Sequence, residues 1–160
     1  EYAQAKAKEI FQKFPAPWVV KSFSPSRHTG IHVTKTFRAL EEAIFDIVSQ
    51  GQSVLVEELI LGKAAALHTV TDFRGEDVYA FPPGNFSNEE KEKLVDLAKN
   101  LHRHLGVRHY LKSDFVLGPK NIYLTAVVFA PSLQEDSHFC RACESVGTKA
   151  PDVLLHMISL

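Results

Sequence analysis

The sequence predicts an α+β protein of two small lobes, each built on an antiparallel sheet. Apolar runs of strand length alternate with segments whose apolar residues repeat at helical spacing. The connections at 72–75 and 118–120 are short and rich in turn residues, which favours hairpins and an antiparallel order. With 160 residues, of which 45% are hydrophobic, the chain can bury a real core. We expect lobes at 1–52 and 53–160, with a cleft where they join.

The first lobe is expected to begin and end its helices at recognisable signals. Pro15 and Pro17 end an amphipathic segment that starts the chain. Thr36 precedes a second helical run as an N-cap, and Gly51 closes that run. The elements expected are, in order, a helix over 1–14, strands over 18–20 and 31–33, and a helix from Thr36 to Gly51.

The second lobe is expected to carry a long helix within a run of strands. Ser87 and Glu90 have the spacing of a capping box, and Gly106 follows the last apolar residue of that helix. The elements expected are strands over 53–57, 64–71, 78–81, 110–117 and 121–129, the helix between Ser87 and Gly106, and helices at 137–147 and 153–160.

The charge balance argues against a polyanionic partner. The sequence has eighteen Lys and Arg residues and nineteen Asp and Glu residues. We therefore expect no broad positive surface that would bind nucleic acid or an anionic membrane. No apolar run approaches the roughly 20 residues of a membrane span, and the first 14 residues lack the order of a signal peptide. These features favour a cytoplasmic protein. The chain opens in a helix and closes on an apolar helical run without a stop signal, so we expect a fragment.

Two cysteines, Cys140 and Cys143, leave three interpretations open. A C-x-x-C pair can be a redox couple or half of a zinc site, with His138 and His156 as possible further ligands. They can also be small core thiols, because Cys143 shares a helical stripe with Phe139. The positions of the other histidines do not by themselves assign them a role; those at 102 and 104 are interpreted as cations at a helix C-terminus.

Lys21 and the pair Glu57 and Glu58 are candidate nucleotide contacts. Lys21 ends an apolar strand before a loop of hydroxyl side chains, where an ammonium and backbone N–H groups can converge on phosphate. The two glutamates follow an apolar strand and precede Leu59 and Ile60, an arrangement that suits a nucleobase. The alternative for each is a solvated strand end with ordinary surface charges.

Asp114 lies inside an apolar strand, where an ionised carboxylate requires a cation or a partner. Residues two apart in a strand share a face, so Lys112 can supply that partner. A metal ligand and a simple ion pair are therefore both open.

The order of these features resembles the ATP-grasp superfamily, and most closely the D-alanine:D-alanine ligase family. The resemblance covers almost the whole chain. The segments that carry it are Pro17 to Lys21 with the loop to Gly30, Val54 to Gly62, Lys112 to Phe115, and Pro131 to Leu133 followed by Ser137.

The resemblance implies ATP and Mg²⁺ as cofactors and a small amino-acid substrate. It implies that Lys112 polarises the substrate carbonyl, that Ser137 binds substrate, and that Asp114 binds metal. Because much of the family's dimer surface lies in a lobe absent here, a monomer is expected. The residues implied at the nucleotide are Lys21, Ser26, His28, Thr29, Gly30, Glu57, Glu58 and Ile60.

The departures from the family pattern are as informative as the matches. Ala64 stands where the family has a ribose-binding glutamate, and Ala126 and Val128 stand where it has the Glu and Asn that bind magnesium. Only four residues, 72–75, replace the family's long substrate-covering loop. Two functions are therefore expected as alternatives: an ATP-binding ligase fragment with impaired catalysis, or a pseudoenzyme or engineered ATP-grasp scaffold without ligase activity.

Overall fold

The computed structural model describes residues 2–23 and 31–160 and divides the chain into two compact units, residues 1–60 and 61–160. Each unit is an α+β structure with one antiparallel sheet, as the sequence predicts. No helix in the described part of the chain is long and apolar enough to cross a membrane.

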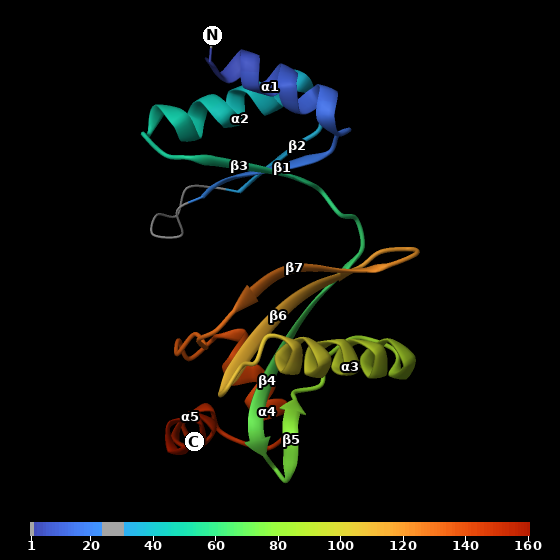
Figure 1. The fold of residues 1–160 in the computed structure, drawn as a ribbon, viewed down its shortest axis with the longest axis vertical. Coiled ribbons are helices and arrows are strands. Elements are labelled where there is room, and N and C mark those ends of the chain that lie inside the picture. The colour runs from blue at the N-terminus through green and yellow to red at the C-terminus, as the bar shows by residue number, and fades with distance from the viewer. Residues whose placement is uncertain (1, 24–30) are drawn as a thin grey trace. The chain divides into compact units, whose positions relative to one another are not determined.

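The first unit is a three-stranded sheet in the order β2-β1-β3, with both of its helices on one face (Figure 1). The alternation of β1 turns Trp18 and Val20 towards α1 and α2, where both are fully buried. The N-cap prediction is confirmed, since Thr36 Oγ1 accepts from the backbone N–H of Ala39 at 3.2 Å. The elements of this unit are α1 (Tyr2–Lys13), β1 (Trp18–Ser22), β2 (His32–Thr34), α2 (Phe37–Ser49) and β3 (Val54–Glu58).

The strand β3 belongs to the first unit, whereas the sequence placed it at the start of the second lobe. It pairs with β1 over five residues, from Trp18 opposite Glu58 to Ser22 opposite Val54. Val54 and Val56 of β3 also pack against the core of the first unit. The first unit therefore extends through Ile60 instead of ending at residue 52.

The second unit is a four-stranded sheet in the order β5-β4-β6-β7, with helices on both faces (Figure 1). Leu67 and Phe115 face α3, and Val70 and Tyr110 face the helices α4 and α5. The elements are β4 (Lys63–Phe73), β5 (Glu76–Ala80), α3 (Asn88–His104), β6 (Tyr110–Leu117), β7 (Ile122–Val128), α4 (His138–Ser145) and α5 (Ala150–Ser159).

The predicted start and end signals of α3 are confirmed. Ser87 and Glu90 form both hydrogen bonds of a capping box. Gly106, just past the C-cap Leu105, has a φ of 61°, the left-handed conformation that favours glycine at a helix end.

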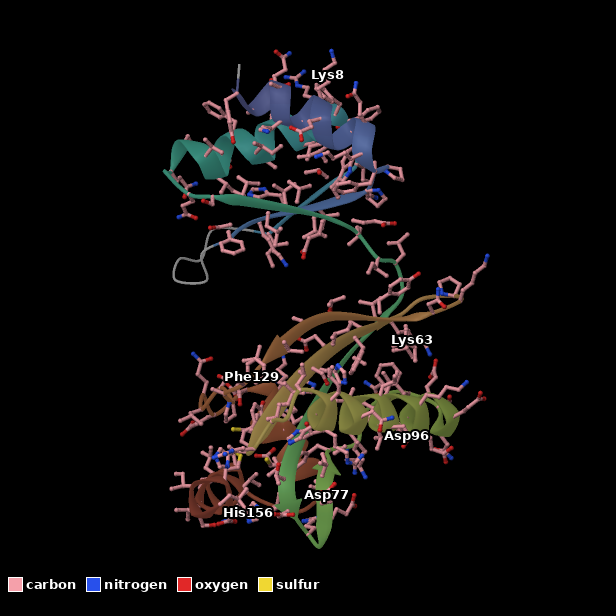
Figure 2. All side chains as sticks on the ribbon, in the orientation of Figure 1. Lys8, Lys63, Asp77, Asp96, Phe129 and His156 are labelled. Atoms are coloured by element: carbon pink, nitrogen blue, oxygen red, sulfur yellow. The ribbon has the colours of Figure 1, made fainter. Side chains whose placement is uncertain are left out.

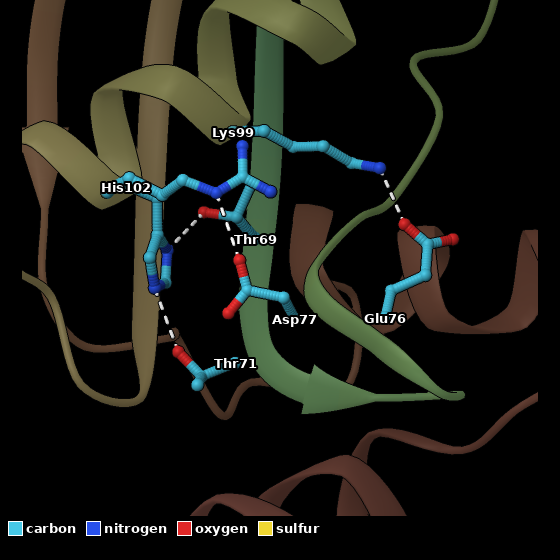
Figure 3. Close-up of polar contacts among 7 residues, drawn as sticks. Thr69, Thr71, Glu76, Asp77, Lys99 and His102 are labelled. Carbon is cyan, nitrogen blue, oxygen red and sulfur yellow. Dashed lines mark hydrogen bonds and ion pairs between the residues drawn. The ribbon is translucent and has the colours of Figure 1, made fainter.

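His102 anchors α3 to the sheet, and its expected role as a helix-terminal cation is wrong. Thr69 Oγ1 donates to the Leu111 carbonyl and accepts from His102 Nδ1, while Thr71 Oγ1 donates to His102 Nε2 (Figure 3). The ring is 1% exposed, and burial lowers its pKa. A neutral imidazole with both nitrogens paired is a structural clamp. Its neighbour Arg103 supplies the surface cation, paired with Asp77 at 3.0 Å.

Candidate functional site

The first group of candidate residues lies on the face of the β2-β1-β3 sheet that carries no helix. Trp18 and Val20 of β1 are buried against the helices, so Lys21 points to the opposite face. Its Nζ lies 2.5 Å from Glu57 Oε2, a diagonal neighbour on β3. Both side chains keep about a third or more of their exposure, at 33% and 42%. The ion pair is thus open to a ligand.

Glu57 and Glu58 lie on opposite faces of the sheet, because consecutive strand residues alternate in direction. Glu57 shares the face of Lys21, while Glu58 lies opposite Trp18 at the exposed end of β3. Beyond the strand, the N–H of Leu59 donates to the Pro17 carbonyl at 2.9 Å. Ile60 is half-buried. Ser26, His28, Thr29 and Gly30 lie outside the described residues.

The second group of candidates lies in the second unit, on the sheet face that carries α4. Lys112 Nζ contacts Asp114 Oδ2 at 2.8 Å, so the same-face ion pair predicted as the alternative is present. Opposite these residues on β7 are Val128 and Ala126, and opposite Asp114 on β4 is Ala66. The carboxylate is therefore paired with one cation, and its direct cross-strand partners Ala66 and Ala126 carry no ligand atoms.

These residues do not fit a magnesium site. Mg²⁺ binds oxygen ligands in near-octahedral geometry, usually through one or two carboxylates together with water and phosphate oxygens. Here Asp114 is the single carboxylate of its cross-strand neighbourhood, and it is already neutralised by Lys112. In the described residues no group of three or more His, Cys, Asp or Glu side chains is placed to hold a metal ion.

Ser137 and the cysteines are placed by the helix α4. Ser137 is its N-cap, and its hydroxyl accepts from the backbone N–H of Cys140 at 3.2 Å. Both cysteines are free thiols. Phe139 and Cys143 are buried on the stripe that the sequence predicted, and burial raises the pKa of the Cys143 thiol to about 11. Cys143 is thus held as an unreactive thiol in the core.

A buried chain of hydrogen bonds beside Lys112 was missed at the level of sequence. His68 lies opposite Lys112 on β4 and is 2% exposed. Its Nδ1 lies 2.6 Å from the Tyr110 hydroxyl, and its Nε2 lies 2.7 Å from Nδ1 of His138 on α4. The available signal was a histidine within an apolar strand, since a buried polar side chain requires partners. Its partners are 42 and 70 residues away, beyond any local pattern.

Burial and neighbouring charges keep both imidazoles neutral near pH 7. Desolvation, with smaller contributions from His138 and Lys112, lowers the pKa of His68 to about 3. Desolvation, Lys112 and Arg141 lower the pKa of His138, and Asp114 partly opposes them. The chain of hydrogen bonds therefore joins neutral groups.

The sequence is similar over almost its whole length to curated D-alanine–D-alanine ligases. A D-alanine–D-alanine ligase of Desulforudis audaxviator is 24% identical over 178 residues, covering 96% of this chain and 58% of that protein. A D-alanine–D-alanine ligase of Legionella pneumophila is 23% identical, covering 95% of this chain and 50% of that protein. No protein-family model matches the chain.

Solved structures with the same fold come from the same group of enzymes. D-alanyl-alanine synthetase A of Vibrio cholerae superposes with a TM-score of 0.76 at 20% identity, over 99% of this chain and 56% of that one. The D-alanine–D-alanine ligase of Bacillus anthracis complexed with ATP gives a TM-score of 0.73 at 15% identity, over 95% and 55%. The chain spans about half the length of the curated relatives it matches. It is therefore related to the D-alanine–D-alanine ligase family and has the α+β fold of that family's ATP-grasp part.

Proposed function

We propose that this chain is the ATP-binding part of an ATP-dependent carboxylate–amine ligase. The observation that carries the proposal is Lys21, an ammonium on the helix-free face of the first sheet, which forms a partly exposed ion pair with Glu57. The likeness to a ligase solved with ATP supports the same assignment. Lys21 contacts the nucleotide phosphates, and Glu57 with the backbone near Ile60 contacts the adenine.

The ion pair of Lys21 does not prevent this role. A partly exposed Lys–Glu pair stabilises a protein by about 0 to 1 kcal/mol, because water and salt screen it. A nucleotide phosphate carries more charge and accepts several hydrogen bonds. Lys21 can therefore exchange Glu57 for phosphate at little cost, and Glu57 becomes free to accept from an amino group.

The chemistry proposed for a longer parent protein is activation of a carboxylate as an acyl phosphate, followed by attack of an amine. In the second unit Lys112 provides the positive charge that polarises the carbonyl. It acts as a point charge, where an arginine would offer two parallel hydrogen bonds. Ser137 binds substrate only by sharing the hydroxyl that now caps α4.

Catalysis by this chain is proposed to be impaired. Phosphoryl transfer depends on the neutralisation of charge on the phosphates, which magnesium provides in most such enzymes. With Ala126 and Val128 beside it, Asp114 offers one carboxylate, and Lys112 occupies that carboxylate. Loss of electrostatic stabilisation of this kind costs on the order of a thousandfold in rate.

A second candidate function is an ATP-grasp scaffold that no longer binds nucleotide. The observation that favours it is the set of small side chains, Ala64, Ala126 and Val128, at the positions where the family resemblance implies ligands. Such side chains remove like-charge repulsion around Asp114 and leave a stable ion pair with Lys112.

Calorimetric titration of the chain with a non-hydrolysable ATP analogue, with and without magnesium, separates the two. Saturable binding that is lost in Lys21→Ala supports the nucleotide-binding function. The matched control is Lys13→Ala, which also removes the lysine of an exposed ion pair in the first unit, with Glu9 at 2.7 Å. Absence of binding into the millimolar range would leave the scaffold as the function.

A further inference from the structure

The chain of hydrogen bonds through Tyr110, His68 and His138 has a definite direction. Tyr110 is 2% exposed, so its O–H proton requires a protein acceptor. Within the described residues, the hydrogen-bond partner of this hydroxyl is His68 Nδ1, at 2.6 Å. The hydroxyl therefore donates and Nδ1 accepts.

That direction determines the tautomer of both imidazoles. With Nδ1 as an acceptor, neutral His68 carries its proton on Nε2 and donates it to His138 Nδ1 at 2.7 Å. Neutral His138 then carries its own proton on Nε2. The reverse direction would leave the buried Tyr110 proton without an acceptor, which is the costly arrangement. The core thus fixes which atom His138 presents outward.

The outward face of His138 borders a cavity of about 380 Å³ in the second unit. His138 is exposed there, and the floor is formed by Ala64, Ala65 and Ala66, whose side chains cannot form hydrogen bonds. Lys63, which starts β4 (Figure 2), belongs to the wall of this cavity. The remaining wall is the segment 83–86 between β5 and α3.

The charges around His138 favour an anion. Lys112 and Arg141 lie close enough to lower its pKa, and Asp114 raises it. Lys112 and Asp114 form an ion pair and largely cancel, which leaves Arg141 as the net positive charge. Lys63 at the wall is paired with Glu90 at 2.9 Å, so it contributes little net charge. A fixed N–H donor in a locally positive setting is complementary to a carboxylate or phosphate oxygen.

We propose that this cavity binds a small oxyanion through the Nε2–H of His138. His68 and Tyr110 are positioning residues that hold the proton on that atom. The inference rests on the proposed function for its biological ligand, since such a ligase handles both a carboxylate and a phosphoryl group. The site itself requires no nucleotide.

The test uses the full chain at neutral pH, without nucleotide, titrated with acetate and, separately, with inorganic phosphate. Long-range ¹H–¹⁵N spectra report the tautomer of His138 and any shift of its Nε2 as anion is added. We expect an Nε2–H tautomer and a saturable shift. Saturation by acetate identifies a substrate carboxylate, and saturation by phosphate alone identifies a phosphoryl group. If neither acetate nor phosphate shifts the Nε2 signal, or if His138 is found as the Nδ1–H tautomer, the proposal is overturned.

Three variants locate the effect. His138→Phe removes the donor and is expected to weaken anion affinity about tenfold or more, the usual range for a hydrogen bond to a charged group. His138→Gln keeps an N–H at a similar reach and is expected to stay within about threefold of the parent. Tyr110→Phe leaves the cavity intact but removes the hydroxyl that sets the direction of the hydrogen bonds through His68 and His138. These hydrogen bonds can then run in either direction, so the His138 tautomer becomes mixed. Unchanged affinity in His138→Phe would contradict the site even if ATP binds elsewhere.

Discussion

Lys21 and Glu57 form an ion pair of 2.5 Å across β1 and β3, although β2 and α2 lie between them in the sequence. The register of the two strands makes them diagonal neighbours on one face. Two residues chosen from separate sequence motifs thus meet in one place.

Lys21→Ala is expected to lower the affinity for an ATP analogue by about tenfold or more, because a charge-assisted hydrogen bond to phosphate is lost. The melting temperature should change little, since an exposed pair contributes about 0 to 1 kcal/mol. Calorimetry and thermal unfolding measure the two effects. A large loss of stability with unchanged affinity would assign Lys21 a structural role instead.

Side chains with ligand atoms beside Asp114 are expected to make the binding of an ATP analogue depend on magnesium. Ala126 lies opposite Asp114 and Val128 opposite Lys112 on the same sheet face. The double variant Ala126→Glu with Val128→Asn should therefore tighten analogue binding about tenfold or more when Mg²⁺ is added. The control is Val127→Glu, opposite Ser113 on the other face, which should show no such dependence. If magnesium changed analogue binding equally in the double variant and in Val127→Glu, a metal site on the sheet face of Asp114 would be refuted.

Stability is expected to fall as the pH drops below 6.5, because His68 and His102 are neutral in the folded protein and become charged when it unfolds. The folded-state pKa of His68 is lowered from 6.5 to about 3, and that of His102 is also lowered. A lowered histidine pKa gives stability that is complete above 6.5 and is lost progressively towards the folded pKa. Each such group contributes at most about 1.4 kcal/mol per pH unit.

Denaturant unfolding from about pH 7 to about pH 5 isolates the histidines, because carboxylates titrate mainly lower. His102→Gln should flatten the slope of unfolding free energy against pH. His104→Gln is the matched control, since His104 lies two residues away on the exposed surface of α3. The same slope in both variants would contradict the assignment.

Gly62→Ala is expected to destabilise the second unit by about 2 kcal/mol or more. An added Cβ would collide with the backbone carbonyl of Leu117, which cannot move without disturbing β6. Gly84→Ala serves as the control, because its Cβ would meet no atom within 4 Å. Thermal unfolding of the two variants makes the comparison, and equal melting temperatures would show that this contact is absent.

Ser113→Ala is expected to be neutral or stabilising by up to about 1 kcal/mol. Ser113 is fully buried, and its hydroxyl has no hydrogen-bond partner within the described parts of the chain. Thr69→Val is expected to cost about 1 to 2 kcal/mol, because Thr69 bonds both His102 and the Leu111 carbonyl. Unfolding free energies that fall in the opposite order would contradict this account.

The local features of the fold were predictable because their causes are local. The cap at Thr36, the capping box of Ser87 and Glu90, and the helix end at Gly106 each depend on residues within a few positions. The pair of Lys112 and Asp114 also follows from strand alternation. These interactions do not require knowledge of distant segments.

Other features depended on which distant segments pair. Periodicity identified β3 as a strand but could not show that its partner is β1, so the first unit proved longer than expected. His102 was interpreted as a surface cation because its position near a helix end is visible in sequence, while its bonds to Thr69 and Thr71 are not.

The sequence by itself therefore determined the α+β class, the order of the elements and the candidate residues Lys21, Glu57 and Asp114, because periodicity, caps and motif order are encoded along the chain. Only the tertiary structure decided that His68 would meet His138, 70 residues away, with Tyr110 behind it. The physical reason is that a buried polar side chain takes whatever partner the packing of strands and helices brings within hydrogen-bond reach, and sequence spacing does not record that packing.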